Sequence, residues 1–204
     1  MQSTASLTIS NLWIERGERD LCQGLSFSVQ SGEIVRILGD NGAGKSSLLK
    51  TIAGVFSPLE GKISYVGEDV TFDRSLLQKD AIYLGHSVGV KSLLTVVENL
   101  RWYCPDVSLG VLHEVLELLE ITNHVDVLVK NLSAGQARRV ALARLWLSNK
   151  TLWLLDEPFA SLDVRGVTLL EQRIQQHVLS GGLVVLTTHH DLLTLSSRDV
   201  VLLP

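Results

Sequence analysis

The sequence predicts an α/β fold with a mainly parallel sheet, and three observations lead to this prediction. Continuous apolar runs at residues 34–38 and 183–187 are typical of strands buried on both faces of a parallel sheet. Apolar residues at helical spacing, as in residues 108–119, lie between such runs. The first run leads into Gly39–Ser46, a glycine-rich turn that ends in Gly-Lys-Ser and opens a helix. A strand, such a turn and a helix in this order form a P-loop, which binds nucleotide phosphates.

The N-terminal third is predicted to add antiparallel strands to this core. Residues 7–14 and 25–29 have the alternation of a half-buried strand, and residues 61–67 are expected to form a short strand and a turn. The polar residues 15–20 between the first two strands are expected to be a turn. The helix after the P-loop is expected to end near Gly54, because glycine accepts the left-handed conformation that often follows a helix.

The middle of the chain predicts a buried strand followed by two helices. The strand covers residues 81–84 and runs into a loop at His86. A Thr-x-x-Glu capping box at Thr95 opens the first helix, which we expect to continue to about Tyr103. Residues 108–119 carry the apolar spacing of an amphipathic helix.

The C-terminal part alternates helices with strands. The expected elements are a helix at 133–145, a strand at 151–156, a helix at 167–178, a strand at 183–187 and a last strand at 199–203. Consecutive helices inside an otherwise α/β pattern predict a small helical subdomain at about residues 87–147. We expect it to be inserted in the core of a single domain that spans residues 1–204.

Composition narrows the class of protein. The chain has 204 residues and is 46% hydrophobic, which is ample for a buried core. Its formal net charge of −4 leaves no basic field, so nucleic acid is not expected as a partner. Met1–Ser6 lacks the features of a signal peptide, and no apolar run is long enough to span a membrane. Cys22 and Cys104 have no pattern and are expected to be reduced, so we expect the protein in the cytosol or on its membrane face.

The P-loop residue types suit the phosphates of a nucleotide triphosphate. Gly42 and Gly44 let the backbone approach phosphate oxygens, and successive N–H groups converge on them at a helix N-terminus. Lys45 suits the β- and γ-phosphates, and the Ser46 hydroxyl suits Mg²⁺. The expected phosphate-binding residues are Gly39, Asp40, Asn41, Gly42, Ala43, Gly44, Lys45, Ser46 and Ser47.

A second strand delivers two carboxylates. The apolar strand at residues 152–155 ends in Asp156 and Glu157, which is the Walker B arrangement. Asp156 is expected to hold Mg²⁺, directly or through water, and Glu157 to polarise the water that attacks the γ-phosphate. An ordinary strand end followed by an acidic loop is the alternative, and the upstream P-loop makes it the weaker one.

A third motif identifies a family. It consists of Leu132, Ser133, Ala134, Gly135 and Gln136, and it resembles the signature Leu-Ser-Gly-Gly-Gln of the ATP-binding cassette (ABC) ATPases. Ala134 replaces a glycine, but a small residue still leaves its N–H available. The resemblance covers residues 7–201 and includes a D-loop at Asp163 and a switch histidine at His189. It implies an ABC-type ATPase core, with a mixed and mainly parallel sheet, N-terminal antiparallel strands and a helical subdomain inserted in a RecA-like part.

The family resemblance also implies how the motifs act. Two copies would form a head-to-tail homodimer, with ATP and Mg²⁺ on the P-loop of one copy and under Ser133, Gly135 and Gln136 of the other. Asp163 would act across that interface, and His189 would contact the γ-phosphate. His189 is chosen over His190 because it follows the strand at residues 183–187 at the position usual in the family. The remaining histidines are expected on the surface or in helices; they are His113, His124 and His177.

Two positions depart from the family pattern. His86 stands where the Q-loop glutamine is usual, and it could still reach Mg²⁺-bound water or sense the γ-phosphate. The charge of such a histidine would depend on pH. Arg16 stands about where an aromatic residue usually stacks on adenine, and a guanidinium can also stack on a purine. Trp13 is nearby but is expected in the core.

The loop around His86 narrows the resemblance to one subfamily. Residues 85–91 are similar to the Gly-His-x-Pro-Gly-x-Lys stretch of the heme exporter ATPase of bacterial cytochrome c biogenesis, with Val88 in place of the proline. Residues 138–147, 152–159 and 187–192 agree with that subfamily. It implies a peripheral ATPase on the cytoplasmic face of the inner membrane, with permease subunits of the cytochrome c maturation complex as partners. Heme is not expected to bind this chain directly, because it has no Cys-x-x-Cys-His sequence.

Several alternatives stay open. An ABC exporter subunit for another small molecule would carry the same motifs. Within the heme-exporter subfamily, hydrolysis would serve either heme export or the release of a heme-loaded chaperone. A soluble ABC ATPase without a transporter is a different class, although such proteins usually carry two cassettes in one chain. A P-loop kinase or GTPase switch would not explain residues 132–136.

Overall fold

The computed structural model describes residues 5–202, except residues 18, 88 and 193. The position of Val88 and the expected strand end at Leu203 therefore lie outside the described residues. The chain groups into two compact units. The first unit comprises residues 1–86, 150–158 and 174–204, and the second comprises residues 87–149 and 159–173. Each unit is described by itself.

The first unit contains two sheets. The antiparallel sheet has the order β2-β1-β4-β5 and is formed by β1 (Ser6–Arg16), β2 (Arg19–Gln30), β4 (Glu60–Tyr65) and β5 (Glu68–Asp69). The parallel sheet has the order β6-β7-β8-β3-β9 and is formed by β3 (Ile34–Leu38), β6 (Ala81–Leu84), β7 (Leu152–Asp156), β8 (Leu183–Thr187) and β9 (Arg198–Val201). All pairings of the second sheet are parallel, as the continuous apolar runs predict.

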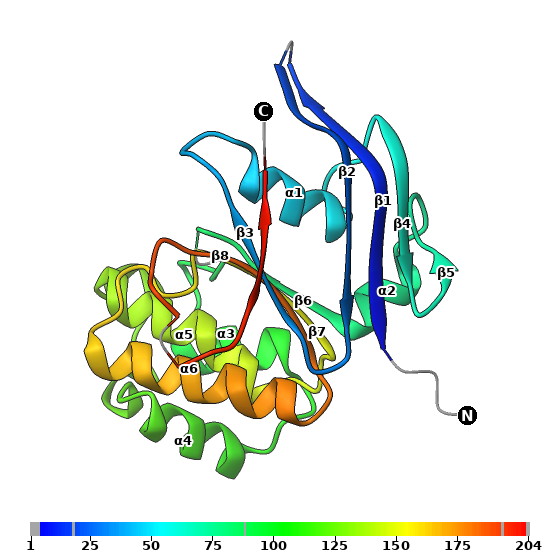
Figure 1. Ribbon diagram of the computed structural model, residues 1–204. Coiled ribbons are helices and arrows are strands. Elements are labelled where there is room, and N and C mark those ends of the chain that lie inside the picture. The colour runs from blue at the N-terminus through cyan, green and yellow to red at the C-terminus, as the bar shows by residue number, and fades with distance from the viewer. Residues whose placement is uncertain (1–4, 18, 88, 193, 203–204) are drawn as a thin grey trace. The chain divides into compact units, whose positions relative to one another are not determined.

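Helix α1 (Lys45–Ile52) packs between these two sheets, as Figure 1 shows. Leu48, Leu49 and Ile52 on this helix are fully buried. They belong to one core that also includes Ile9 of β1 and Val185 of β8. The helix ends as predicted, since Gly54 has a φ of 81° directly after the C-cap residue. The core thus anchors α1 between the sheets, and the P-loop at its N-terminus is held in place by that packing.

The N-terminal hairpin is longer than the sequence predicts. The expected turn at residues 15–20 is wrong in extent, because β1 continues to Arg16 and β2 begins at Arg19. Glu15 pairs with Asp20 and Arg16 with Arg19, so the two strands support each other beyond the apolar part of the ladder. Polar residues form strand here because they stand at the exposed end of a hairpin, where both faces meet solvent.

A short helix and a short strand were not predicted. Helix α2 (Ser75–Asp80) follows Asp73, whose side chain accepts a hydrogen bond from the Ser75 N–H at 2.9 Å. Strand β5 has two residues and pairs with the end of β4. Both elements are too short to give a periodic pattern.

The second unit is helical. It contains α3 (Val96–Tyr103), α4 (Leu109–Leu118), α5 (Ala134–Leu147), two short 3₁₀ turns at Thr122–His124 and Val129–Asn131, and the first part of α6 (Val164–Leu179). Its core is formed by buried residues of α3, α4 and α5, including Leu100, Leu116 and Val140. None of the described helices is long and apolar enough to cross a membrane.

The capping box predicted at Thr95 is confirmed. The Thr95 hydroxyl accepts a hydrogen bond from the Glu98 N–H at 3.2 Å, and the Glu98 carboxylate accepts one from the Thr95 N–H at 2.8 Å. A second box opens α5, between Ser133 and Gln136. These boxes fix the starts of α3 and α5 to the residue.

The contact between β4 and β1 gives a stability test at two glycines with left-handed backbones. A Cβ atom on Gly61 would lie 2.5 Å from the Asn11 carbonyl oxygen, whereas a Cβ atom on Gly67 would meet nothing within 4 Å. We expect Gly67→Ala to lower the free energy of unfolding by about 1 kcal/mol through its φ of 84° alone. Gly61→Ala should cost about 3 kcal/mol, because overpacking adds to the same backbone penalty. Chemical denaturation measures both, and equal losses would contradict the packing of β4 on β1.

Candidate functional site

The P-loop joins β3 to α1. The N-cap residue Gly44 has a φ of 97°, and Gly42 has a φ of 84°. A Cβ atom on Gly44 would lie 2.8 Å from the Cβ atom of Leu21, so both the backbone and the packing favour glycine there. The Lys45 ammonium donates hydrogen bonds to the carbonyl oxygens of Gly39 at 2.6 Å and Asp40 at 3.1 Å. The loop therefore curves around its own lysine and leaves the N–H groups at the start of α1 facing outward.

Asp156 at the end of β7 is 2% exposed and connects three elements. Its Oδ1 atom accepts hydrogen bonds from the Ser46 hydroxyl at 3.0 Å and from the Thr187 hydroxyl at 2.8 Å. Asp156 and Thr187 are register partners in the adjacent strands β7 and β8. A hydroxyl and a carboxylate side by side are hard oxygen donors of the kind that Mg²⁺ prefers. The donor set therefore fits this ion.

Strand β6, which pairs with β7, carries Tyr83 close enough to Asp156 to be affected by its charge. Burial raises the pKa of the Tyr83 hydroxyl to about 12, and the negative charge of Asp156 adds to the shift. The hydroxyl therefore stays protonated throughout the neutral range. A Cβ atom on Gly85 would lie 2.9 Å from this hydroxyl, so the start of the loop at His86 rests on Tyr83.

Glu157 has a backbone conformation that is unusual for its residue type. Its φ is 48°, and its N–H donates to both oxygen atoms of Thr187, the hydroxyl at 3.0 Å and the carbonyl at 3.1 Å. A left-handed backbone at a non-glycine residue costs free energy, and such residues cluster at functional sites. The Glu157 carboxylate lies 3.6 Å from the Nε2 atom of His189 and accepts a hydrogen bond from the His189 N–H at 3.3 Å. The structure thus places the two predicted catalytic residues side by side.

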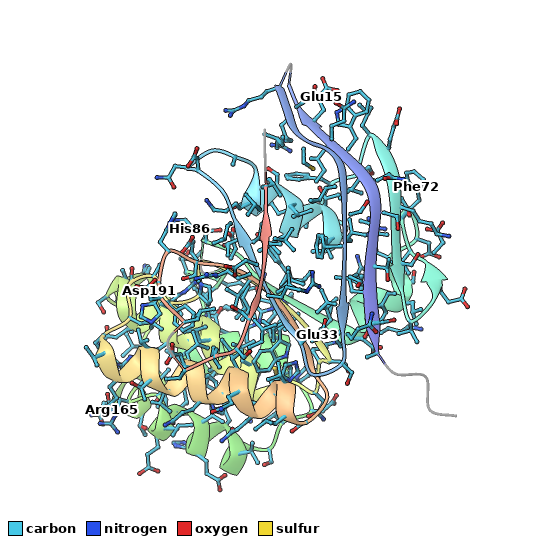
Figure 2. All side chains as sticks on the ribbon, in the orientation of Figure 1. Glu15, Glu33, Phe72, His86, Arg165 and Asp191 are labelled. Atoms are coloured by element: carbon cyan, nitrogen blue, oxygen red, sulfur yellow. The ribbon has the colours of Figure 1, made fainter. Side chains whose placement is uncertain are left out.

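A pocket of about 660 Å³ in the first unit collects most of the predicted residues. It is lined by Arg16, Arg19, Leu21, Asn41, Gly42, Gly44, Lys45, Ser46, Ser47, His86, Asp156, Glu157 and His189. His86 is exposed, and Figure 2 labels its side chain just beyond β6. Gly39, Asp40 and Ala43 of the P-loop do not line the pocket. Arg19 and Leu21 were not predicted to be site residues. Arg19 lies in the segment that was expected to be a turn, and Leu21 follows it on β2.

Arg16 lines the pocket, whereas Trp13 takes a different place from the one predicted. The Arg16 guanidinium lies over the Phe56 ring, 4.1 Å from its centroid, while the residue also lines the pocket. Such a cation–π contact orients the guanidinium plane. Trp13 is half-buried rather than in the core, because its indole N–H donates to the Asp20 carboxylate at 2.6 Å.

The second unit carries the signature residues at the start of α5. Ser133 is the N-cap, and its hydroxyl accepts a hydrogen bond from the Gln136 N–H at 3.2 Å. The Gln136 side chain accepts in return from the Ser133 N–H at 2.8 Å. Ala134 and Gly135 occupy the first turn, where N–H groups have no partner within the helix. A Cβ atom on Gly135 would lie 3.2 Å from the Ser161 carbonyl oxygen, so glycine lets the D-loop approach α5 closely.

Asp163 is held by an arginine of the signature helix. The Arg139 guanidinium donates two hydrogen bonds to the Asp163 carboxylate, at 2.9 and 2.7 Å, and one to Glu120 at 2.9 Å. A hydrogen bond from the Gly166 N–H is the largest cause that lowers the pKa of Asp163, and Arg139 adds to it. Arg165, labelled in Figure 2 near the start of α6, pairs with Glu120 from the other side.

The other histidines do not all lie on the surface. His113 is exposed on α4, as expected. His177 is buried and stacks on Trp153, with ring centroids 3.7 Å apart and an angle of 7° between the rings. Its position in helix α6 agrees with the prediction, and its burial comes from Trp153 on β7, which is distant in the sequence. His124 bonds to the signature residue Gln136.

Comparison with known proteins gives the family. A family model described as ABC transporter matches residues 22–160. The chain belongs to the ABC transporter family. The cytochrome c biogenesis ATP-binding export protein CcmA of Escherichia coli K12 is 44% identical over 192 residues, which cover 94% of this chain and 93% of that protein. CcmA of Shigella flexneri shows the same identity and coverage.

Solved ABC structures agree with this membership. The structure of an ATP-binding subunit of an ABC transporter has a TM-score of 0.80 at 25% identity, covering 90% of this chain and 79% of that one. An ABC transporter ATP-binding protein from Pyrococcus furiosus has a TM-score of 0.82 at 24% identity, covering 97% of each chain. The predicted fold class is thus confirmed, and this ABC chain is an ATP-binding protein that couples ATP hydrolysis to transport.

The hydrogen bonds of Thr187 give a test of the site. We expect Thr187→Val to lower the maximal rate of ATP hydrolysis about tenfold or more, because the Asp156 carboxylate and the Glu157 N–H both lose a buried partner. Thr187→Ser keeps the hydroxyl and should retain most of the rate. Steady-state hydrolysis at saturating ATP measures both, and a fully active valine variant would show that Thr187 does not set the geometry.

Proposed function

We propose that this chain is the ATP-hydrolysing subunit of a bacterial membrane complex for heme export or handling in cytochrome c biogenesis. The observation that carries the proposal is the 44% identity to CcmA over nearly the whole of both chains. The loop at residues 85–91, which follows β6 and contains His86, supports the same subfamily. The partners would be the permease subunits of the cytochrome c maturation complex, and heme would be handled by those partners rather than by this chain.

The proposed place of action is the cytoplasmic face of the inner membrane. As an ABC exporter subunit, the chain works with membrane permease partners and as a dimer. We assign to it a peripheral position beneath those partners. The helical subdomain proposed at residues 87–147 would then be the part that reports on the nucleotide, which is consistent with the grouping of residues 87–149 in the second unit.

The proposed roles in the first unit follow from the geometry of the pocket. The N–H groups of the P-loop and the Lys45 ammonium would bind the phosphates of ATP. Ser46 and Asp156 would hold Mg²⁺, which offsets charge on the phosphate oxygens when it is bound. Glu157 would orient the attacking water and accept its proton, while His189, 3.6 Å from that carboxylate, would hold it toward the γ-phosphate. His86 would stand for the Q-loop residue, and Arg16 would bind the base while stacked on Phe56.

The second unit would complete the site of another copy. In a head-to-tail homodimer, the start of α5 presents the N–H groups of Ala134 and Gly135 and the Ser133 hydroxyl to the γ-phosphate. Leu132 and Gln136 flank them. The N–H of Ala134 is the same donor that a glycine would supply, so the change from the family pattern leaves this binding face intact. Asp163, fixed by Arg139, would act across the same interface.

Replacing the proposed base gives the first test. We expect Glu157→Gln to bind ATP with near-normal affinity but to lower turnover by about 100-fold or more, since the amide cannot accept the proton of water. The variant should also accumulate as an ATP-bound dimer. Turnover assays and size-exclusion chromatography with ATP measure the two effects. Near-normal turnover would remove Glu157 as the base and would leave the family assignment untouched.

Deletion of the gene tests the biological role. We expect the deletion strain to lack periplasmic holocytochrome c, because the membrane partners would no longer be driven by ATP hydrolysis. A plasmid copy of the natural sequence should restore it, whereas Lys45→Ala should not, since a charged phosphate contact is lost. Heme-stained gels of periplasmic proteins give the readout. Unaffected cytochromes would favour an ABC exporter for another small molecule.

A further inference from the structure

The side-chain amide of Gln136 has two partners in the second unit. Its Oε1 atom accepts the hydrogen bond of the Ser133 N–H at 2.8 Å. Its Nε2 atom lies 2.9 Å from the Nε2 atom of His124, in the 3₁₀ turn Thr122–His124. A backbone N–H can only donate, so the oxygen of the amide must face Ser133 and its NH₂ group must face His124.

This orientation determines the state of the histidine. The Gln136 NH₂ group has no lone pair to offer, so His124 Nε2 must accept the hydrogen bond. The ring is then neutral and carries its hydrogen on Nδ1. That Nδ1 atom is buried and meets no hydrogen-bond partner among the described residues. An unpaired buried N–H is unfavourable. The hydrogen bond at Nε2 offsets part of this cost and holds the ring in place.

We propose that His124 is a positioning residue for the nucleotide-binding face of the signature. It accepts a hydrogen bond from Gln136 and so fixes the side chain that closes the capping box with Ser133. The inference rests on the proposed function, in which the Ser133 hydroxyl and the first N–H groups of α5 bind the ATP of a second copy. A free glutamine side chain samples several rotamers, and a second partner beside Ser133 restricts that freedom before the second copy arrives.

The expected effect is confined to one half of the site. His124 and Gln136 belong to the second unit, whereas the residues that line the pocket belong to the first. Loss of the hydrogen bond should therefore weaken ATP-dependent association of two copies and slow turnover. It should leave the affinity of a single copy for nucleotide unchanged.

Two substitutions distinguish the loss of the hydrogen-bond acceptor at His124 Nε2 from the loss of the volume of the ring. His124→Met fills similar space without a hydrogen-bond acceptor of comparable strength, while His124→Gln can place a carbonyl oxygen near the position of Nε2. We expect the methionine variant to lower turnover about five- to tenfold, and to require correspondingly more ATP for dimer formation in a Glu157→Gln background. The glutamine variant should keep at least half of the turnover. Binding of a fluorescent ATP analogue to the monomer should be the same in all of them.

A double-mutant cycle keeps the test valid if a variant is less stable. If His124 acts through Gln136, His124→Met should have no further effect on dimer formation in a Gln136→Ala background. An effect of the same size in both backgrounds would overturn the proposal, as would a methionine variant that dimerises and turns over like the natural chain. Equal losses in the methionine and glutamine variants would also overturn it, because the shape of the ring rather than its acceptor would then matter.

Ser133→Ala distinguishes failure of this inference from failure of the proposed function. If Ser133→Ala leaves ATP-dependent association intact, the Ser133 hydroxyl does not bind the second nucleotide and the role proposed for it in this half-site fails. If Ser133→Ala abolishes association and His124→Met does not weaken it, only the positioning role of His124 is overturned.

Discussion

The carboxylate of Asp156 depends on three segments that are far apart in the sequence. It is buried at the end of β7, and burial of a charged group is costly unless hydrogen-bond donors surround it. Ser46 at the start of α1 and Thr187 at the end of β8 supply such donors. The parallel register of β7 with β8 aligns Asp156 with Thr187, so a shift of one residue would turn one of them to the other face. The order and register of the strands thus determine which side chains meet at the carboxyl ends of the sheet.

Both predicted nucleotide contacts use the start of a helix, but the two starts are built differently. The N-cap of α1 is Gly44, which has no side chain to cap the helix, so its first N–H groups stay available for phosphate. The N-cap of α5 is Ser133, within a reciprocal capping box. The first can surround a phosphate with backbone alone, while the second offers a hydroxyl on a helix that is already held in shape. The start of α1 therefore suits a preformed phosphate pocket. The start of α5 suits a surface that a ligand approaches from outside the chain.

Local patterns predicted the parts of the structure that local chemistry determines. The strands Ile34–Leu38 and Leu183–Thr187 and the capping box at Thr95 agree with the prediction to the residue. The glycine-rich loop and the acidic strand end, which identify the P-loop and Asp156, are also local signals. Motif spacing therefore gave most of the pocket without any knowledge of how the strands pair.

The errors share a physical cause, which is pairing between distant residues. Glu15 and Arg16 are strand because they pair with Asp20 and Arg19, and the extended strand β2 brings Arg19 and Leu21 to the pocket. His177 lies in a helix as predicted, but its burial depends on Trp153 of β7, which is distant in the sequence and stacks against it. His124 carries no motif, and its bond to Gln136 depends on a 3₁₀ turn that no periodicity indicates. Only coordinates reveal such contacts.

The contact between Arg139 and Asp163 restricts rotation within the second unit. One guanidinium nitrogen of Arg139, Nη2, donates to both oxygen atoms of the Asp163 carboxylate, which holds the two groups close together. Arg139 is also bonded to the Leu119 carbonyl oxygen and to Glu120 at the end of α4, so it cannot turn to follow a moving partner. A single side chain on α5 thus joins the end of α4 to the D-loop. A lysine at this position would keep the charge but would make a single contact, about which the D-loop could pivot.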